Sequence, residues 1–186
     1  MRDLNAMAQE YRPHAPTEIE NNLIMNWYPR RIIERSGSVQ SLLELGLGHG
    51  FTAKYFSKAS AHHVIVDGAS EIIDTFKREH PDFSGTIVLD YFETFDTRER
   101  FDVVVMGFVL EHVDDPQLIL QRYRRFLKPN GKLYIAVPNA KSLNRRLGLE
   151  MGLIDNIYDL NQNDIALGHQ RQYCLDTLRA AVSESG

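Results

Sequence analysis

A glycine-rich segment, Gly46-Leu47-Gly48-His49-Gly50, follows an apolar run and is the first place where residue types suggest a ligand site. Glycine tolerates backbone angles that a side chain forbids, and it lets a ligand approach the main chain closely. A helix that begins after such a turn presents free N–H groups and the positive end of its dipole. In an open α/β sheet this is the crevice outside the carboxyl ends of the strands, where ligands bind. The same glycines would also fit an ordinary tight turn, so the interpretation depends on later motifs.

The spacing of these glycines separates two classes of cofactor. The dinucleotide fingerprint G-x-G-x-x-G would require a third glycine at position 51, which is Phe51, and this disfavours a nicotinamide oxidoreductase. The observed pattern, Glu44-x-Gly46-x-Gly48-x-Gly50, resembles the first motif of the class I S-adenosylmethionine-dependent methyltransferases. The resemblance covers about residues 17–140 and continues, in chain order, with Asp67, Asp90, Glu111-His112 and Lys128-Pro129-Asn130-Gly131.

The resemblance implies S-adenosylmethionine as the cofactor, S-adenosylhomocysteine as its product, and a role for each matching residue. Glu44 would hold the methionyl end, Asp67 the ribose hydroxyls and Asp90 the adenine amino group. An acidic side chain at the end of the second strand can accept both ribose hydroxyls, as it does in dinucleotide folds. The full set of expected cofactor-binding residues is Glu44, Gly46, Leu47, Gly48, Gly50, Asp67, Gly68, Asp90, Tyr91, Phe92, Gly107 and Phe108.

The expected reaction is methyl transfer to a small-molecule acceptor, with a sugar or sugar-linked compound among the candidates. A sulfonium makes its methyl carbon electrophilic, so the chemistry requires no metal, and no metal site is expected. A hydroxyl acceptor would need a base within hydrogen-bond reach, and histidine suits that role near neutral pH. His112 follows the fourth strand and is the better-placed candidate, while His169 is the second. Two alternatives stay open: His112 has a structural or pocket-lining part, or the protein binds the cofactor without catalysis, as a regulatory protein.

The elements that must position these residues alternate between apolar strands and amphipathic helices. This order predicts an α/β fold with a doubly wound, Rossmann-like, mostly parallel sheet that has helices on both faces. Strands are expected at 40–46, 63–67, 86–89, 101–106 and 132–138, and helices from 17 to 36 with a break or kink at Pro29, and at 50–59, 70–79, 115–127, 140–151 and 176–184. The chain is interpreted as a single domain, 1–186, in which an N-terminal arm and helices (1–38) precede a cofactor-binding core (39–138) and a substrate-side segment (139–186).

Several helical faces have a predicted partner. In the first helix, Ile19, Leu23, Ile24 and Trp27 share one face that is expected to pack on the sheet. In the family such helices often also cover the cofactor, which makes Tyr11 and Trp27 candidate lid contacts. Later helices are expected to begin at the caps Ser70 and Asp115-Pro116, and the second of them to bury Leu118, Ile119, Tyr123, Phe126 and Leu127.

The segment after Pro138 is expected to form the substrate wall. Val137-Pro138-Asn139 and Arg145-Arg146-Leu147-Gly148 faintly resemble methyltransferases of sugar and cell-surface polysaccharide pathways, and the two arginines are candidates for an anionic substrate group. Residues 152–168 are interpreted as a loop. The chain ends where a sixth strand would begin, so the C-terminal strands of the family's usual seven-stranded sheet are expected to be missing. This predicts five parallel strands, with the fifth at an edge of the sheet. An apolar edge strand favours pairing with another chain. The chain is therefore interpreted either as a truncated form of a longer protein or as one whose edge is covered by residues 152–168 or by a partner, such as a second copy of the chain.

Composition narrows the function class. The chain has 186 residues, 43% hydrophobic and 25% charged, which is typical of one globular domain. Its net charge is −4 and it has no basic stripe, so nucleic acid is not the expected partner. The single cysteine, Cys174, excludes an intramolecular disulfide. Neither a membrane-inserted segment nor a signal-peptide core is recognisable, and a cytoplasmic location is the expectation.

Overall fold

The structure is a computed structural model that describes residues 18–37 and 39–186. Tyr11, a candidate lid contact, lies outside the described residues. Of the helices in the described ranges, none combines the length and the apolarity needed to cross a membrane. The elements, in chain order, are α1 (Glu18–Ser36), β1 (Val39–Leu45), α2 (Ala53–Ala59), β2 (Ser60–Asp67), α3 (Ser70–Glu79), β3 (Thr86–Leu89), β4 (Phe101–Gly107), α4 (Pro116–Arg124), β5 (Leu127–Ala136), α5 (Leu143–Glu150), α6 (Gln162–Ala166) and α7 (Leu175–Glu184).

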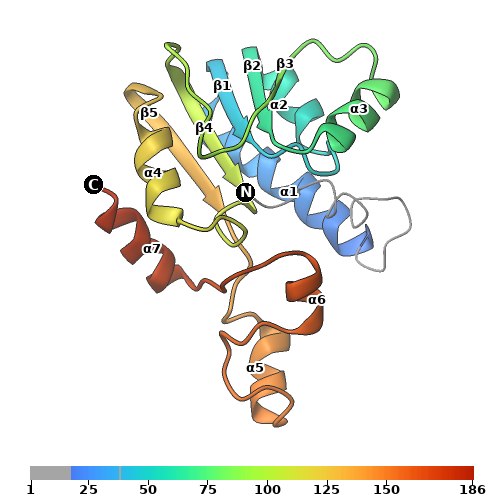
Figure 1. Cartoon of the computed structure of the whole chain (residues 1–186), viewed down its shortest axis with the longest axis vertical. Helices are drawn as coiled ribbons and strands as arrows, with labels where there is room; N and C mark the ends of the chain where they lie inside the picture. The colour runs from blue at the N-terminus through green and yellow to red at the C-terminus, as the bar shows by residue number, and fades with distance from the viewer. Residues whose placement is uncertain (1–17, 38) are drawn as a thin grey trace.

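The five strands form one sheet in the order β3-β2-β1-β4-β5, and every neighbouring pair is parallel. The expected fold class and the edge position of the fifth strand are therefore confirmed (Figure 1). The strand order changes direction between β1 and β4, so the connections after these two strands run to opposite faces of the sheet. In such sheets the crevice at this switch point, outside the carboxyl ends of the strands, is where ligands bind.

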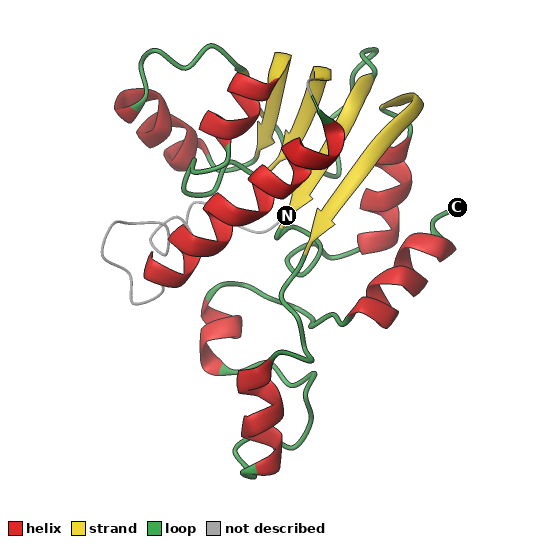
Figure 2. Cartoon of the chain, turned by 180° about the vertical axis from the view of Figure 1, so that it is seen from behind, coloured by secondary structure: helices red, strands yellow, loops and turns green. Residues whose placement is uncertain are grey.

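Alternate residues of the strands pack against different helices. Leu43 and Leu45 of β1 join a buried cluster with residues of α4 and α7, on one face of the sheet. Leu42 joins a second cluster with Tyr28 and Ile32 of α1, on the other face. Successive side chains of a strand point to opposite faces, so both faces of the central strands must be apolar to be covered. The two helical layers are seen from opposite sides in Figures 1 and 2.

The buried face of α1 differs from the expectation. Leu23 and Trp27 are 69% and 65% exposed, and Ile24 is also exposed, so their predicted packing on the sheet is wrong. Tyr28 and Ile32 are buried instead. Pro29 lies inside one continuous helix. Helical periodicity defines a stripe of residues, but the tilt of the helix on the sheet decides which stripe is covered.

The expected helix starts are partly right. The Asp115 side chain accepts a hydrogen bond from the Leu118 backbone N–H at 3.0 Å, which confirms it as the cap of α4. Leu118 itself is exposed, contrary to its predicted burial, and Leu120 is buried in its place. Ala69 rather than Ser70 caps α3, because the helix already begins at Ser70.

The segment that follows β5 extends beyond the carboxyl ends of the strands and carries α5 and α6 (Figure 2). Residues 152–168 are not wholly a loop as expected, since α6 forms within them and is closed by a capping box between Asn161 and Asp164. In both views this segment lies below the sheet rather than along β5, so the idea that it covers the edge strand is wrong. β5 begins at Leu127, earlier than expected, because its pairing with β4 continues across a register irregularity between Phe101 and Val103.

Candidate active site

A cavity of about 530 Å³ opens at the carboxyl ends of β1, β2 and β4, and its outer wall comes from residues 138–172. Ten of the residues expected at the site line it: Gly46, Leu47, Gly48, Asp67, Gly68, Phe92, Gly107, Phe108, His112 and His169. Four others, Glu44, Gly50, Asp90 and Tyr91, do not. The structure thus brings together residues that the sequence separates by more than 120 positions.

The glycine turn has the conformation for which glycine is needed. Gly46, Gly48 and Gly50 have φ values of +82°, +51° and +70°, in the region that other residues rarely adopt. Gly46 and Gly48 line the cavity, so their main chain is open to a ligand. Gly50 has another role, because a Cβ atom there would lie 2.5 Å from the Phe76 ring. Its lack of a side chain allows α3 to pack against the turn.

The Asp67 carboxylate connects the two loops on this side of the cavity. It accepts hydrogen bonds from the backbone N–H groups of Leu47, at 2.7 Å, and Ala69, at 2.8 Å. Burial raises the pKa of Asp67 above its usual value, and these backbone bonds oppose the rise. Each carboxylate oxygen has two lone pairs, so the group can accept further bonds from a ligand in the cavity.

Glu44 lies beneath the cavity rather than on its surface. Its buried carboxylate accepts a hydrogen bond from the Thr52 hydroxyl and is 3.0 Å from Nε2 of His63. Thr52 lines the cavity, so Glu44 acts on the site through Thr52. His63 lies within β2, where it pairs with Leu42 of β1, so its ring reaches Glu44 diagonally across the two strands.

The loop after β3 contributes Phe92 to the cavity. The Asp90 carboxylate accepts hydrogen bonds from the Tyr91 backbone N–H at 2.8 Å and from the Thr94 hydroxyl at 2.5 Å. Asp90 therefore shapes the turn that presents Phe92.

The end of β4 is crowded by α1. A Cβ atom on Gly107 would lie 2.2 Å from the Tyr28 hydroxyl, so any larger residue at this position would require the Tyr28 side chain to move. Phe108 follows with a φ of +60°, which is uncommon for a residue with a side chain and typical of functional sites. Its backbone N–H donates to the Ala136 carbonyl at 2.8 Å, which fixes this turn against the end of β5.

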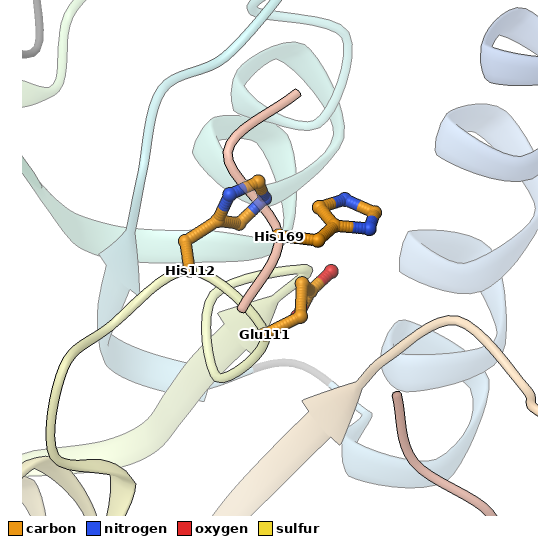
Figure 3. Close-up of side chains that lie close together, drawn as sticks. All are labelled: Glu111, His112 and His169. Atoms are coloured by element: carbon orange, nitrogen blue, oxygen red, sulfur yellow. The ribbon is translucent and has the colours of Figure 1, made fainter. Parts of the chain in front are cut away.

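Three titratable side chains converge beyond this turn: Glu111, His112 and His169 (Figure 3). One ligand atom from each lies within 4.8 Å of the others, and the two imidazole rings meet edge to face at 4.7 Å between centroids. Glu111 is 1% exposed, and neither of its carboxyl oxygens has a hydrogen-bond partner among the described residues. Burial raises the pKa of Glu111 to about 8, although its own backbone N–H and, to a smaller extent, the charge of Arg171 oppose the rise.

Backbone contacts hold His169 next to His112. The Gln170 backbone N–H donates to the Glu111 carbonyl at 2.8 Å, and the Gln170 side chain donates to the His112 carbonyl at 2.5 Å. Arg171 donates to the Leu110 carbonyl at 2.9 Å. Sequence reasoning treated Glu111 only as part of a motif and missed it as a site residue. The adjacent Glu111-His112 pair at a strand end was the signal that could have identified it.

Arg145 and Asp164 support the outer wall. Arg145 donates to the Ile157 carbonyl at 2.8 Å and to the Asp164 carboxylate at 3.3 Å. Asp164 is in turn 3.3 Å from Nδ1 of His169. Burial lowers the pKa of His169, and Asp164 opposes that shift. Arg145 is thus engaged by the protein itself, whereas Arg146 is exposed and away from the cavity.

Comparisons with known proteins agree with this geometry. A family model described as a methyltransferase domain matches residues 14–186. A ubiquinone biosynthesis O-methyltransferase of Actinobacillus pleuropneumoniae is 32% identical over 110 residues, which cover 54% of this chain and 46% of the relative. One from Bradyrhizobium diazoefficiens is 35% identical over 102 residues, with 53% and 40% covered. The chain therefore spans less than half the length of these two curated relatives.

Solved structures show the same fold at low sequence identity. N-methyltransferase NodS from Bradyrhizobium japonicum WM9, in complex with S-adenosyl-L-homocysteine, matches with a TM-score of 0.65 and 19% identity, covering 97% of this chain and 85% of that one. The plantazolicin methyltransferase BpumL, also in complex with S-adenosylhomocysteine, matches with a TM-score of 0.73 and 14% identity, covering 97% and 73%. The family match confirms the family expected from the sequence: the chain belongs to the methyltransferase domain family, and its fold is the one that these methyltransferase structures share.

Proposed function

We propose that the protein transfers a methyl group from S-adenosylmethionine to a hydroxyl of a small molecule bound beside Glu111, His112 and His169. One observation carries this proposal. A single cavity joins the glycine turn and Asp67 on one side to a buried carboxyl and two imidazoles on the other. The O-methyltransferase relatives support a hydroxyl as the acceptor group.

The cavity fits the cofactor in size and chemistry. Its volume of about 530 Å³ lies within the usual range of ligand pockets, roughly 300–1,000 Å³. We assign the ribose hydroxyls to Asp67, the adenine ring to the side of Phe92, and the methionine end to the main chain of Gly107 and Phe108. We assign supporting roles to the four expected residues outside the lining: Glu44 positions Thr52, Gly50 admits α3, and Asp90 with Tyr91 holds the Phe92 loop.

When bound, S-adenosylmethionine supplies a methyl carbon that its sulfonium makes electrophilic. The chain's own residues then have three tasks: to align the acceptor oxygen with that carbon, to exclude water, and to take up the hydroxyl proton. The histidines proposed from the sequence as bases, His112 and His169, both line the cavity, and we assign the acceptor to the space beside them. Glu111 adds a buried carboxyl at the same place.

Release of S-adenosylhomocysteine with a panel of acceptors tests the proposal. The panel contains sugars and sugar-linked compounds, which the sequence suggests, and hydroxyl-bearing precursors of ubiquinone, which the names of the relatives suggest. Turnover with at least one hydroxyl acceptor is the expected result. Calorimetric binding of the cofactor, with no turnover on any acceptor, would instead favour the non-catalytic alternative.

Two further expectations remain proposals. The acceptor is a small molecule rather than a nucleic acid, which fits the net charge of −4.

The exposed edge of β5 is a candidate surface for pairing between two copies of the chain. Light scattering tests the second expectation, and a monomer at high protein concentration would contradict it.

A further inference from the structure

We propose that Glu111, His112 and His169 form a binding site for a divalent transition-metal ion, of which Zn²⁺ is the representative. This site would replace the sequence-based expectation that no metal is present. Two imidazoles and one carboxylate are a recurrent catalytic ligand set for zinc, and they also suit iron and related ions. Three protein ligands leave a coordination position open for a substrate.

The geometry is close to what a metal ion requires. One ligand atom from each residue lies within 4.8 Å of the other two. In a tetrahedral site with bonds of about 2.0–2.1 Å, neighbouring ligand atoms lie about 3.3 Å apart. Rotations of the side chains that move each ligand atom by about an ångström would close the difference. Figure 3 shows the three side chains close together, with the Glu111 carboxyl pointing toward the His169 ring.

The burial of Glu111 is a second, independent observation. The side chain is 1% exposed, and both carboxyl oxygens lack hydrogen-bond partners among the described residues. Buried polar atoms without partners are rare, because their desolvation is not compensated. A cation between Glu111 and the imidazoles would supply the missing interaction.

Asp164 has the position of a group that orients a metal-binding histidine. Its Oδ1 is 3.3 Å from Nδ1 of His169, at ion-pair distance but without the geometry of a hydrogen bond, so a small rotation of the ring would let Nδ1 donate to Asp164 and leave Nε2 for the ion. Histidines that bind metals usually donate their other N–H to a carboxylate or a carbonyl. The other oxygen of Asp164 accepts from the Asn161 backbone N–H at 2.9 Å, which anchors it.

The role of the ion rests on the proposed function. An acceptor hydroxyl in the open position would have its pKa lowered by the ion, as bound water does. Its proton passes to solvent, the oxygen forms a bond to the methyl carbon, and the carbon–sulfur bond breaks with its electron pair on sulfur. The products are the methyl ether and S-adenosylhomocysteine. His112 then acts as a metal ligand instead of as a general base.

Metal binding by the full chain, measured without any acceptor, tests the site. Chelator-treated protein is dialysed against Zn²⁺ and analysed for bound metal, and Co²⁺ is titrated in parallel to follow its visible absorption. We expect one ion per chain. We also expect at least a tenfold loss of affinity in His169→Ala and in the near-isosteric Glu111→Gln. His62→Ala serves as the matched control, because His62 is exposed, lies outside the cavity and should leave binding unchanged.

Absence of stoichiometric metal on the wild-type chain would overturn the proposal, as would unchanged affinity in folded His169→Ala and Glu111→Gln. The wild-type Co²⁺ spectrum requires no variant, so it decides the question even if one variant fails to fold. Methyl transfer by metal-free protein at the full rate would refute the assigned role and leave the proposed function standing. Stoichiometric binding without transfer to any acceptor would support the site and count against the proposed function.

Discussion

Replacement of Asp67 by asparagine separates the structural role of this carboxyl from its ligand-binding role. The carboxylate accepts two backbone N–H bonds, from Leu47 at 2.7 Å and from Ala69 at 2.8 Å. An asparagine side chain has one acceptor oxygen, so it can keep only one of them and turns a donor toward the other.

The expected loss of stability follows from this count. A hydrogen bond to a charged group contributes about 1.5–3 kcal/mol, and a buried donor left unpaired costs about 1–3 kcal/mol. Burial disfavours the charged form of Asp67 and raises its pKa, so removal of the charge offsets part of this loss. We expect a net destabilisation of about 1–3 kcal/mol, which lowers the melting temperature by about 2–12 °C for a domain of this size.

Cofactor affinity should fall as well, by about 10- to 100-fold, because a charge-assisted bond to the ribose is weakened. Titration calorimetry below both melting temperatures measures this change. Asp102→Asn is the matched control, since Asp102 also accepts backbone bonds, from Gln40 at 3.1 Å and Ser41 at 2.9 Å, but lies outside the cavity. Equal cofactor affinity in Asp67→Asn and wild type would refute the ribose assignment. An unchanged melting temperature would refute the anchoring of the two loops.

Three other predictions concern the same cavity. Gly107→Ala places a Cβ atom 2.2 Å from the Tyr28 hydroxyl. Urea unfolding should therefore show a decrease of about 1–3 kcal/mol in the free energy of unfolding, and adding Tyr28→Phe should restore part of it. Equal stability of Gly107→Ala and the wild type would contradict the packing argument. His112→Ala should lower turnover by about a hundredfold or more and leave the cofactor affinity nearly unchanged. If the variant instead binds the cofactor more weakly but has normal turnover at saturating cofactor, His112 is only part of the pocket wall. In metal-free protein the pKa of Glu111 is raised from 4.5 to about 8. The folded state therefore holds this proton more tightly than the unfolded state does. As a result, the free energy of unfolding should decrease as the pH rises between these two values. Glu111→Gln should remove this pH-dependent contribution to stability. If the free energy of unfolding changes with pH in the same way in Glu111→Gln and in the wild type, Glu111 makes no such contribution.

Local sequence determined much of the fold and half of the site. The apolar runs of β1 and β4, the glycines with positive φ, and the Asp115-Pro116 helix start depend on neighbouring residues, so they were predictable. The order of motifs then implied the strand order and the side of the sheet where the cofactor binds. Asp67 follows from this local logic, because its place at the end of β2 needs only a strand and a turn.

Tertiary packing decided the rest. The helical period of α1 could not tell whether Trp27 or Ile32 faces the sheet, because that depends on the tilt of the helix. Glu44 meets His63 only because β1 and β2 are neighbours, and its carboxylate is held beneath the cavity between His63 and Thr52. His169 meets His112 across 57 positions because backbone bonds join the segments around them. The raised pKa of Glu111 is likewise a property of burial, which only the assembled fold creates.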